Sequence, residues 1–220
     1  MTDLPTDPIL DEIRTALGTR IPAHAGFDGW GLAAVDRAAA DVGLDADVAR
    51  LAFPGGAVDL IDAWFASVDA GLSARLSPEA LAAMKVRERI GALVMARIAQ
   101  VAPHRDALRR ALSILAMPQN AATGARLGWR AADTMWRLAG DTATDYNHYT
   151  KRAILAGVYA ATLLVLLDDE SEDLTETRAF LNRRIDGIMR FEKAKAGLVA
   201  RRAHLPSLSR FVGRLRYPAV

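Results

Sequence analysis

The chain has 220 residues, of which 51% are hydrophobic and 25% are charged, so global disorder is excluded and one domain or two small ones are expected. It contains no cysteine, which excludes a disulfide framework, a thiolate metal cluster and a cysteine nucleophile. The net charge of +2 is unevenly divided, because the residues from Arg183 onward sum to +8 and the first 182 residues sum to −6. An acidic body with a basic C-terminal end indicates an anionic partner for the C-terminus.

Apolar residues recur at helical spacing along nearly the whole chain, without a convincing run of strict alternation. The sequence therefore predicts a single all-α domain of about ten helices, with Asp45 and Ser77 as N-cap residues and Gly43 as a helix stop. In chain order, the helices are expected at residues 7–18, 30–42, 45–53, 57–76, 78–101, 104–117, 120–138, 144–167, 174–201 and 207–215. We divide the chain into three N-terminal helices (1–56), a helical core (57–200) and a basic tail (201–220).

One stretch of this pattern, residues 153–167, carries no charge over 15 residues. A helix that spans a bilayer needs about 20 apolar residues, and charged groups flank this stretch on both sides. The sequence therefore predicts a helix that is buried all round, either in the core or at a subunit interface.

Positive signs of catalysis are absent from the sequence. The histidines His24, His104, His148 and His204 are scattered, and there is no HExxH, G-x-S-x-G, Walker or G-x-G-x-x-G motif. Asp145 and His148 lie three residues apart, which a metal could use, but a polar helix start is the stronger interpretation. We predict no enzyme activity, no catalytic residue, no metal and no cofactor; an uncharacterised enzyme that uses Asp145 and His148 is the alternative.

Residues 30–53 have the spacing of a helix-turn-helix, with Gly43 in the turn, and resemble the N-terminal region of TetR-type repressors. The short second helix offers Asp45, Asp47 and Arg50, and residues 1–62 have a net charge of −7. Because phosphate neutralisation supplies most non-specific DNA affinity, we expect the fold without the DNA binding. A TetR-type transcriptional regulator with an apolar effector pocket is the alternative function.

The most specific cluster follows residue 128. Trp129, Asp133 and Trp136 share one helix face, and the next helix opens with acidic residues that suit a helix N-terminus. Exposed aromatic side chains beside Asn and Arg are typical of interaction hot spots. The members of this second group are Asp141, Asp145, Tyr146, Asn147, Tyr149 and Arg152. The alternative is that Tyr149 and Tyr159 cover the core.

The pattern Asp133-x-x-Trp136-x-x-Ala139-Gly140-Asp141-x-x-x-Asp145-x-Asn147-x-Tyr149-Thr150-x-Arg152-Ala153-x-Leu155 resembles the signature of the ubiquinone (coenzyme Q) biosynthesis accessory protein family, Coq-nine. The resemblance extends over about residues 10–190. It includes residues 85–90, Ala116-Met117-Pro118-x-Asn120 and Phe180-Leu181-x-x-Arg184.

The resemblance implies a TetR-like homodimer that binds an isoprenoid quinone intermediate or a phospholipid. Such a protein presents the lipid to the pathway hydroxylase without catalysing a reaction. The patch implied to contact the hydroxylase is Asp145, Asn147, His148, Tyr149 and Arg152. His148 departs from the family, where Trp, a favoured interface anchor, is common at that position. We expect lipid binding at Trp129, Met135 and Trp136.

The C-terminal tail has an amphipathic pattern of its own. Leu208, Phe211, Val212 and Leu215 recur at helical spacing, and Arg210 and Arg214 lie on other faces. A short basic amphipathic helix binds the headgroup layer of an anionic membrane. Because the N-terminal residues are acidic and do not form a secretory signal, we expect a cytoplasmic protein that is peripheral on a bacterial-type inner membrane. The alternative is a tail that folds back onto the acidic body.

Overall fold

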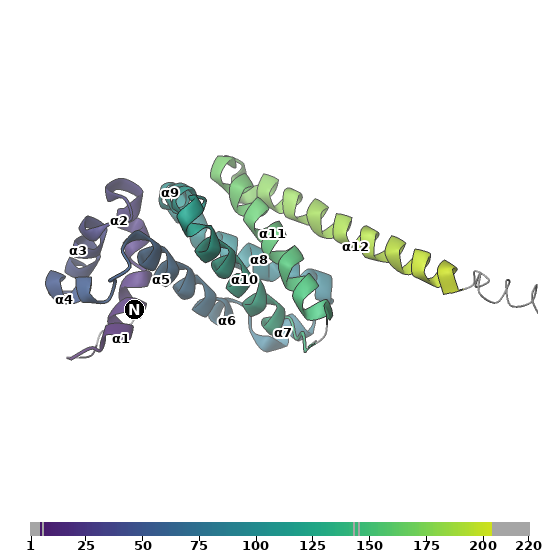
Figure 1. Cartoon of the computed structure of the whole chain (residues 1–220), viewed down its shortest axis with the longest axis horizontal. Helices are drawn as coiled ribbons and strands as arrows, with labels where there is room; N and C mark the ends of the chain where they lie inside the picture. Colours follow the sequence, from purple (N-terminus) through teal and green to yellow (C-terminus); the bar gives the residue numbers. More distant parts are fainter. Residues whose placement is uncertain (1–4, 6, 143, 145, 204–220) are drawn as a thin grey trace, which may run out of the picture. The chain divides into compact units, whose positions relative to one another are not determined.

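The computed structural model describes residues 5, 7–142, 144 and 146–203, with the backbone alone at residues 146, 189, 191–203 (Figure 1). The described residues form α-helices and short 3₁₀ turns without a strand, so the predicted all-α class is confirmed. The helices are α1 (Leu10–Gly18), α2 (Ile21–Asp28), α3 (Leu32–Ala40), α4 (Ala46–Leu51), α5 (Ala57–Ala70), α6 (Leu72–Arg75), α7 (Pro78–Ala82), α8 (Val86–Val101), α9 (Arg105–Leu115), α10 (Ala121–Leu138), α11 (Tyr146–Asp168) and α12 (Thr175–Ala203). The 3₁₀ turns are η1 (Ala102–His104), η2 (Pro118–Asn120) and η3 (Glu172–Leu174).

The chain divides into two compact units, Met1–Leu181 and Asn182–Val220. Within the first unit, the N-terminal helices pack directly on the rest, because α1 lies against α5 and α2 lies against α9. Helix α5 supplies much of the core through its buried residues Leu60, Ile61 and Trp64. Helices α1 to α4 and the later helices of the first unit therefore share one hydrophobic core.

A stack of aromatic side chains joins the N-terminal helices to this core. The rings of Trp30 and Trp64 stack with their centroids 5.3 Å apart, and Phe65 continues the stack at 5.1 Å from Trp64. The indole Nε1 of Trp30 donates a hydrogen bond of 2.9 Å to the carbonyl oxygen of Ala107. Burial lowers the pKa of His104, which packs edge-on against Trp64, so this imidazole is neutral near pH 7.

The predicted helix caps are confirmed. The Asp45 carboxylate accepts hydrogen bonds from the amides of Asp47 and Val48 at 2.9 and 3.1 Å, and Ser77 Oγ accepts one from Ala80 at 3.2 Å. All three bonds satisfy amides that have no partner within the first helical turn. Gly43, between α3 and α4, has a φ of +68°, a conformation that glycine adopts without steric cost.

The predicted helices differ from the structure at three points: a helix forms at 21–28 where none was expected, and the helices expected at 57–76 and 78–101 are each interrupted. Helix α2 forms where no helix was expected, because Pro22 falls in its first turn, where a missing N–H costs nothing, and Ile21 and Ala25 bury one face. The helix expected at 78–101 is broken after Ala82. A new helix begins at Val86, and the Glu88 carboxylate accepts a hydrogen bond of 2.9 Å from the amide of Lys85, a local cap that competes with a continuous helix.

The apolar helix α11 is half buried in the chain, so the prediction of burial all round within a monomer core is wrong. Leu155, Tyr159 and Leu166 face inward, whereas Ile154 and Leu164 are 36% and 59% exposed. By length and composition, Asn147–Asp168 could cross a membrane, although a core helix passes the same test. The exposed face leaves the subunit-interface alternative open.

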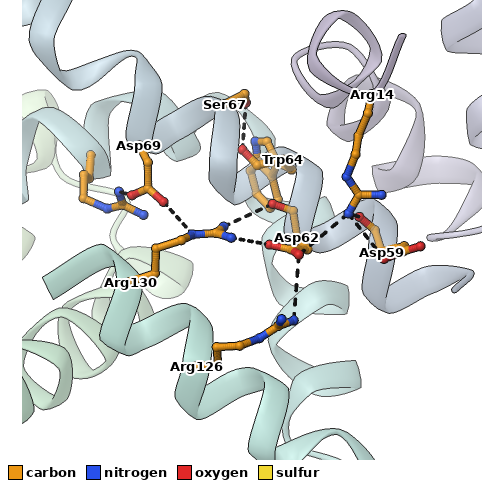
Figure 2. A network of polar contacts seen from close by, with 9 residues as sticks. Arg14, Asp59, Asp62, Trp64, Ser67, Asp69, Arg126 and Arg130 are labelled. Carbon is orange, nitrogen blue, oxygen red and sulfur yellow. Dashed lines mark hydrogen bonds and ion pairs between the residues drawn. The ribbon is translucent and has the colours of Figure 1, made fainter. Parts of the chain in front are cut away.

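Carboxylates along α5 form a series of ion pairs with arginines of other helices in the first unit (Figure 2). Arg14 from α1 binds Asp59 at 3.3 Å, and Arg130 from α10 binds both Asp62 and Asp69, the latter at 2.9 Å. The three carboxylates belong to α5, so this helix connects α1 electrostatically to α10. The contacts are partly buried and therefore less screened than surface pairs.

Candidate functional site

The candidate site is the junction where α10 ends and α11 begins. Gly140 follows α10 with a φ of +86°, which allows the chain to leave the helix. Arg89 from α8 donates hydrogen bonds to the carbonyl oxygens of Ala139 at 2.9 Å and Ala82 at 3.1 Å. One guanidinium therefore satisfies the ends of both α7 and α10 and fixes where the connection to α11 starts.

A partly buried ion-pair cluster, which we call the Arg152 clamp, holds the first turns of α11 on α10. The Arg152 side chain is 2% exposed and binds Asp133 at 2.6 Å and Asp141 at 3.1 Å. It also donates to the carbonyl oxygen of His148 at 3.1 Å. Lys151 binds the second oxygen of Asp141 at 2.7 Å. The clamp consists of Asp133, Asp141, Lys151 and Arg152.

The charge balance of the clamp determines the ionisation of Asp141. Burial raises the pKa of this carboxyl, but the hydrogen bonds and charges of Lys151 and Arg152 outweigh burial and hold the pKa below its usual value. Asp141 is therefore ionised at neutral pH and remains a partner for both cations.

Trp136 covers the clamp. Its indole Nε1 donates a hydrogen bond of 3.1 Å to the carbonyl oxygen of Lys151, and the Lys151 ammonium lies 5.3 Å from the centroid of its ring. A cation over an aromatic face is attracted by the ring quadrupole. This predicted lipid-binding residue is thus engaged in the α10–α11 contact.

An exposed aromatic group lies on the solvent side of the clamp. Tyr149 is 61% exposed, as expected for a residue near the start of α11, so the alternative that it covers the core is wrong. Its ring lies 6.1 Å from Trp129 on α10 and 5.0 Å from the adjacent His148, between centroids. We call Trp129, His148 and Tyr149 the aromatic patch, beside which Asn147 is exposed.

The structure places the other predicted site residues in different surroundings. Arg152, predicted to contact a partner, is buried in the clamp, and Met135 is fully buried in α10. Tyr159 is buried, as the core alternative expected. Asp145 and the tail residues Leu208, Arg210, Phe211, Val212, Arg214 and Leu215 lie outside the described residues, as does the helix predicted at 207–215.

Sequence reasoning missed two residues that build the junction. Lys151 and Arg89 were not predicted as site residues, although both belong to stretches that carry the family resemblance. Both lie in polar stretches beside other charged residues, so the local sequence did not single them out. In the parts of the chain that the structure describes, no group of three or more His, Asp or Glu side chains could hold a metal.

In the region predicted as a helix-turn-helix, the one arginine of the short second helix is paired with carboxylates of the same chain. Arg50 on α4 binds Asp36 through Nε and Nη2 at 2.8 and 2.7 Å, and Asp47 through Nη1 at 2.8 Å. The hydrogen bond from Arg50 holds the pKa of Asp36 below its usual value, so the pair is ionised at neutral pH. The guanidinium that could have met a DNA phosphate is thus engaged with carboxylates of the same chain.

The helices are arranged in a TetR-like fold. A crystal structure of a TetR transcriptional regulator from Nitrosomonas europaea matches it with a TM-score of 0.62, over 79% of this chain and 96% of that chain. The two sequences are 22% identical, so this likeness concerns the fold alone.

The sequence around the junction is similar to a known family, because residues 121–192 match the COQ9 family model. The recognition made from the motif is confirmed as a similarity to the COQ9 family. The rat ubiquinone biosynthesis protein COQ9, mitochondrial, is 33% identical over 83% of this chain and 59% of its own length. Its human counterpart is 32% identical over 80% of this chain and 56% of its own length. The chain thus spans somewhat more than half the length of these relatives.

Proposed function

We propose that this protein is a non-catalytic, lipid-binding accessory protein of ubiquinone biosynthesis that presents an isoprenoid quinone intermediate to a pathway hydroxylase. The observation that carries the proposal is the match of residues 121–192 to the COQ9 family, together with relatives that are named ubiquinone biosynthesis proteins. These residues include α10 and α11, so the matched segment coincides with the candidate site.

The hydroxylase is proposed to dock on the aromatic patch. Exposed aromatic side chains on a rigid helical base are favourable anchors, because little side-chain entropy is lost when they bind. The Arg152 clamp supplies that rigid base, and Tyr149 is the most exposed member of the patch. Asn147 and Asp145 are proposed to complete the contact, with His148 in place of the Trp that is common in the family.

The membrane contact is assigned to the C-terminal tail on its sequence pattern alone. Each Arg near an anionic surface contributes about 1 kcal/mol, so the tail supports reversible docking rather than permanent anchoring. Truncation after Arg202 should abolish sedimentation with anionic liposomes while the helical content stays unchanged. Unchanged sedimentation would assign membrane binding to another part of the chain.

A homodimer is proposed through the exposed face of α11. Ile154 and Leu164 lie on that face, and Gly157 between them borders open space. An apolar helix face with a small residue at its centre allows close approach of a second helix. A second copy of this chain would cover this face in the manner of an isologous interface.

The lipid proposal is tested by extracting purified protein and identifying the bound lipid by mass spectrometry. An isoprenoid quinone intermediate is expected, and a phospholipid would keep the lipid-binding function with another ligand. Protein without any lipid would contradict it. For the docking surface, Tyr149→Ala should weaken hydroxylase binding in a pull-down without lowering the melting temperature; a collapse of melting would instead make Tyr149 a core residue.

A TetR-type regulator with an apolar effector is the second candidate, favoured by the structural likeness to the Nitrosomonas regulator. It requires DNA affinity that falls steeply with salt concentration. The acidic N-terminal helices and the engaged Arg50 weigh against it. A mobility shift at low salt with genomic DNA fragments separates the two functions, because only the regulator gives a retarded band.

A further inference from the structure

Exposed apolar side chains gather where α1 meets α4 (Figure 1). The two helices are joined by Arg14, which lies one turn after Leu10 and donates a hydrogen bond of 3.2 Å to the carbonyl oxygen of Ala52, the residue after Leu51. Leu51 is 65% exposed, and Ile9 at the start of α1 is 64% exposed. We call the exposed residues Ile9, Leu10, Val48 and Leu51 the N-terminal apolar face.

Other residues of the same helices supply the hydrophobic core. Ile13 and Leu17 of α1 and Ala49 of α4 are fully buried. Single exposed apolar residues are ordinary on a protein surface, whereas several on two touching helices form a patch of the kind that marks an interaction site. The N-terminal apolar face is therefore a surface that packing within the chain leaves uncovered.

The charge beside this face is negative. Asp47 lies one turn before Leu51, and its side chain is 88% exposed. Arg50 is shared between Asp47 and Asp36, so two carboxylates face one guanidinium and the group keeps one negative charge. Asp11, in the first turn of α1, adds a further exposed carboxylate. The apolar face is thus bordered by negative charge.

This charge selects among the possible occupants. DNA and an anionic membrane would be repelled, because both present phosphates. A second copy of the chain that used the same face would bring like charges together. A cationic partner is attracted instead. An amphipathic helix can place its apolar side chains on those of α1 and α4 while its Lys and Arg side chains meet the surrounding carboxylates.

We propose that the N-terminal apolar face binds a basic amphipathic helix of a partner protein. In a helix-turn-helix, the second helix is the one that enters the DNA groove. In this chain the corresponding helix, α4, exposes Val48 and Leu51 beside carboxylates, which is chemistry for a cationic protein segment rather than for phosphates. The contact goes beyond the proposed lipid presentation, because α1 and α4 form it without the aromatic patch on α10 and α11.

The probe is a labelled amphipathic helical peptide of leucine and lysine, titrated with the purified full chain and followed by fluorescence polarisation. The wild type should bind it, with an affinity that falls as the salt concentration rises, because part of the attraction is between exposed charges. Leu51→Ser removes an apolar anchor without changing a charge and should weaken binding about tenfold. Asp47→Asn should weaken it about threefold and reduce its dependence on salt.

The matched control is Val86→Ser, which removes an exposed apolar side chain at the start of α8 and should leave the affinity unchanged. Val48→Ser repeats the test at the neighbouring anchor, so a folding defect in one variant does not decide the result. A peptide with glutamate in place of lysine should not bind. Wild-type affinity in both anchor variants, an equal loss in Val86→Ser, or equal binding of the glutamate peptide would each overturn the proposal and leave the lipid function untouched.

Discussion

Replacing Arg152 with methionine removes the cation that joins α10, the turn after it and the first turns of α11. The side chain is 2% exposed and makes two ion pairs, at 2.6 Å to Asp133 and 3.1 Å to Asp141. Removing one partner of a buried ion pair costs about 3–5 kcal/mol, because the remaining charge is left without compensation. Here each carboxylate keeps a second cation, since Arg137 binds Asp133 at 2.9 Å and Lys151 binds Asp141 at 2.7 Å.

The expected loss is therefore at the lower end, about 3 kcal/mol in the free energy of unfolding. For a chain of this size, such a loss lowers the melting temperature by about 6–12 °C. Circular dichroism during heating and a urea titration measure both quantities. The matched control is Arg137→Met, which removes a cation that is 74% exposed from the same carboxylate and should cost under about 1 kcal/mol. If Arg152→Met also cost under about 1 kcal/mol, the clamp would not be what fixes α11 on α10.

Three further predictions address packing, pH and assembly. Gly18→Ala should destabilise the fold by about 2 kcal/mol in a urea titration, because the new Cβ would lie 2.7 Å from the backbone oxygen of Ala63; unchanged stability would mean that α1 and α5 separate easily. Hydrogen bonds from Ser171 and Thr177 outweigh burial and hold the pKa of Asp169 below its ordinary value of 3.8, so the stability that this carboxylate contributes is present above about pH 4 and is lost as the pH falls further. The melting temperature of Asp169→Asn should therefore fall less steeply with decreasing pH than that of the wild type. An equally steep fall in the variant would contradict this. Gly157→Arg should yield a folded monomer in sedimentation analysis, because its Cβ meets open space, and a persistent dimer would exclude this face as the interface.

The sequence predicted the chemistry of the α10–α11 junction better than its geometry. The motif contains Asp133, Asp141 and Arg152, but one-dimensional spacing does not show that all three converge at one buried point. Arg152 was consequently predicted as a surface residue. Tyr149 was predicted as exposed, because aromatic and polar groups at a helix start exceed what capping needs, and it is exposed.

Arg89 illustrates what spacing along the chain cannot reveal. Its hydrogen bond to the carbonyl oxygen of Ala139 spans 50 residues of sequence, and no local pattern records such a contact. The contact of the Arg97 guanidinium with the Tyr159 ring is of the same kind, since α8 and α11 meet only in the folded chain. A charged or hydroxyl group in an apolar helix indicates a buried interaction, but the sequence does not show which residue is its partner.

The amino-acid sequence by itself determined the all-helical class, the caps at Asp45 and Ser77, the family of residues 121–192 and the acidic character that opposes DNA binding. These properties depend on residue type and on neighbours a few positions away, which the sequence states directly. The sequence showed an acidic body and a basic C-terminal end, and the structure shows how charges within the first unit are paired. Arg50 binds Asp36, and carboxylates of α5 bind arginines of α1 and α10. Only the tertiary structure decided which face of α11 is covered and which charges are buried together, because both depend on contacts between helices far apart in sequence.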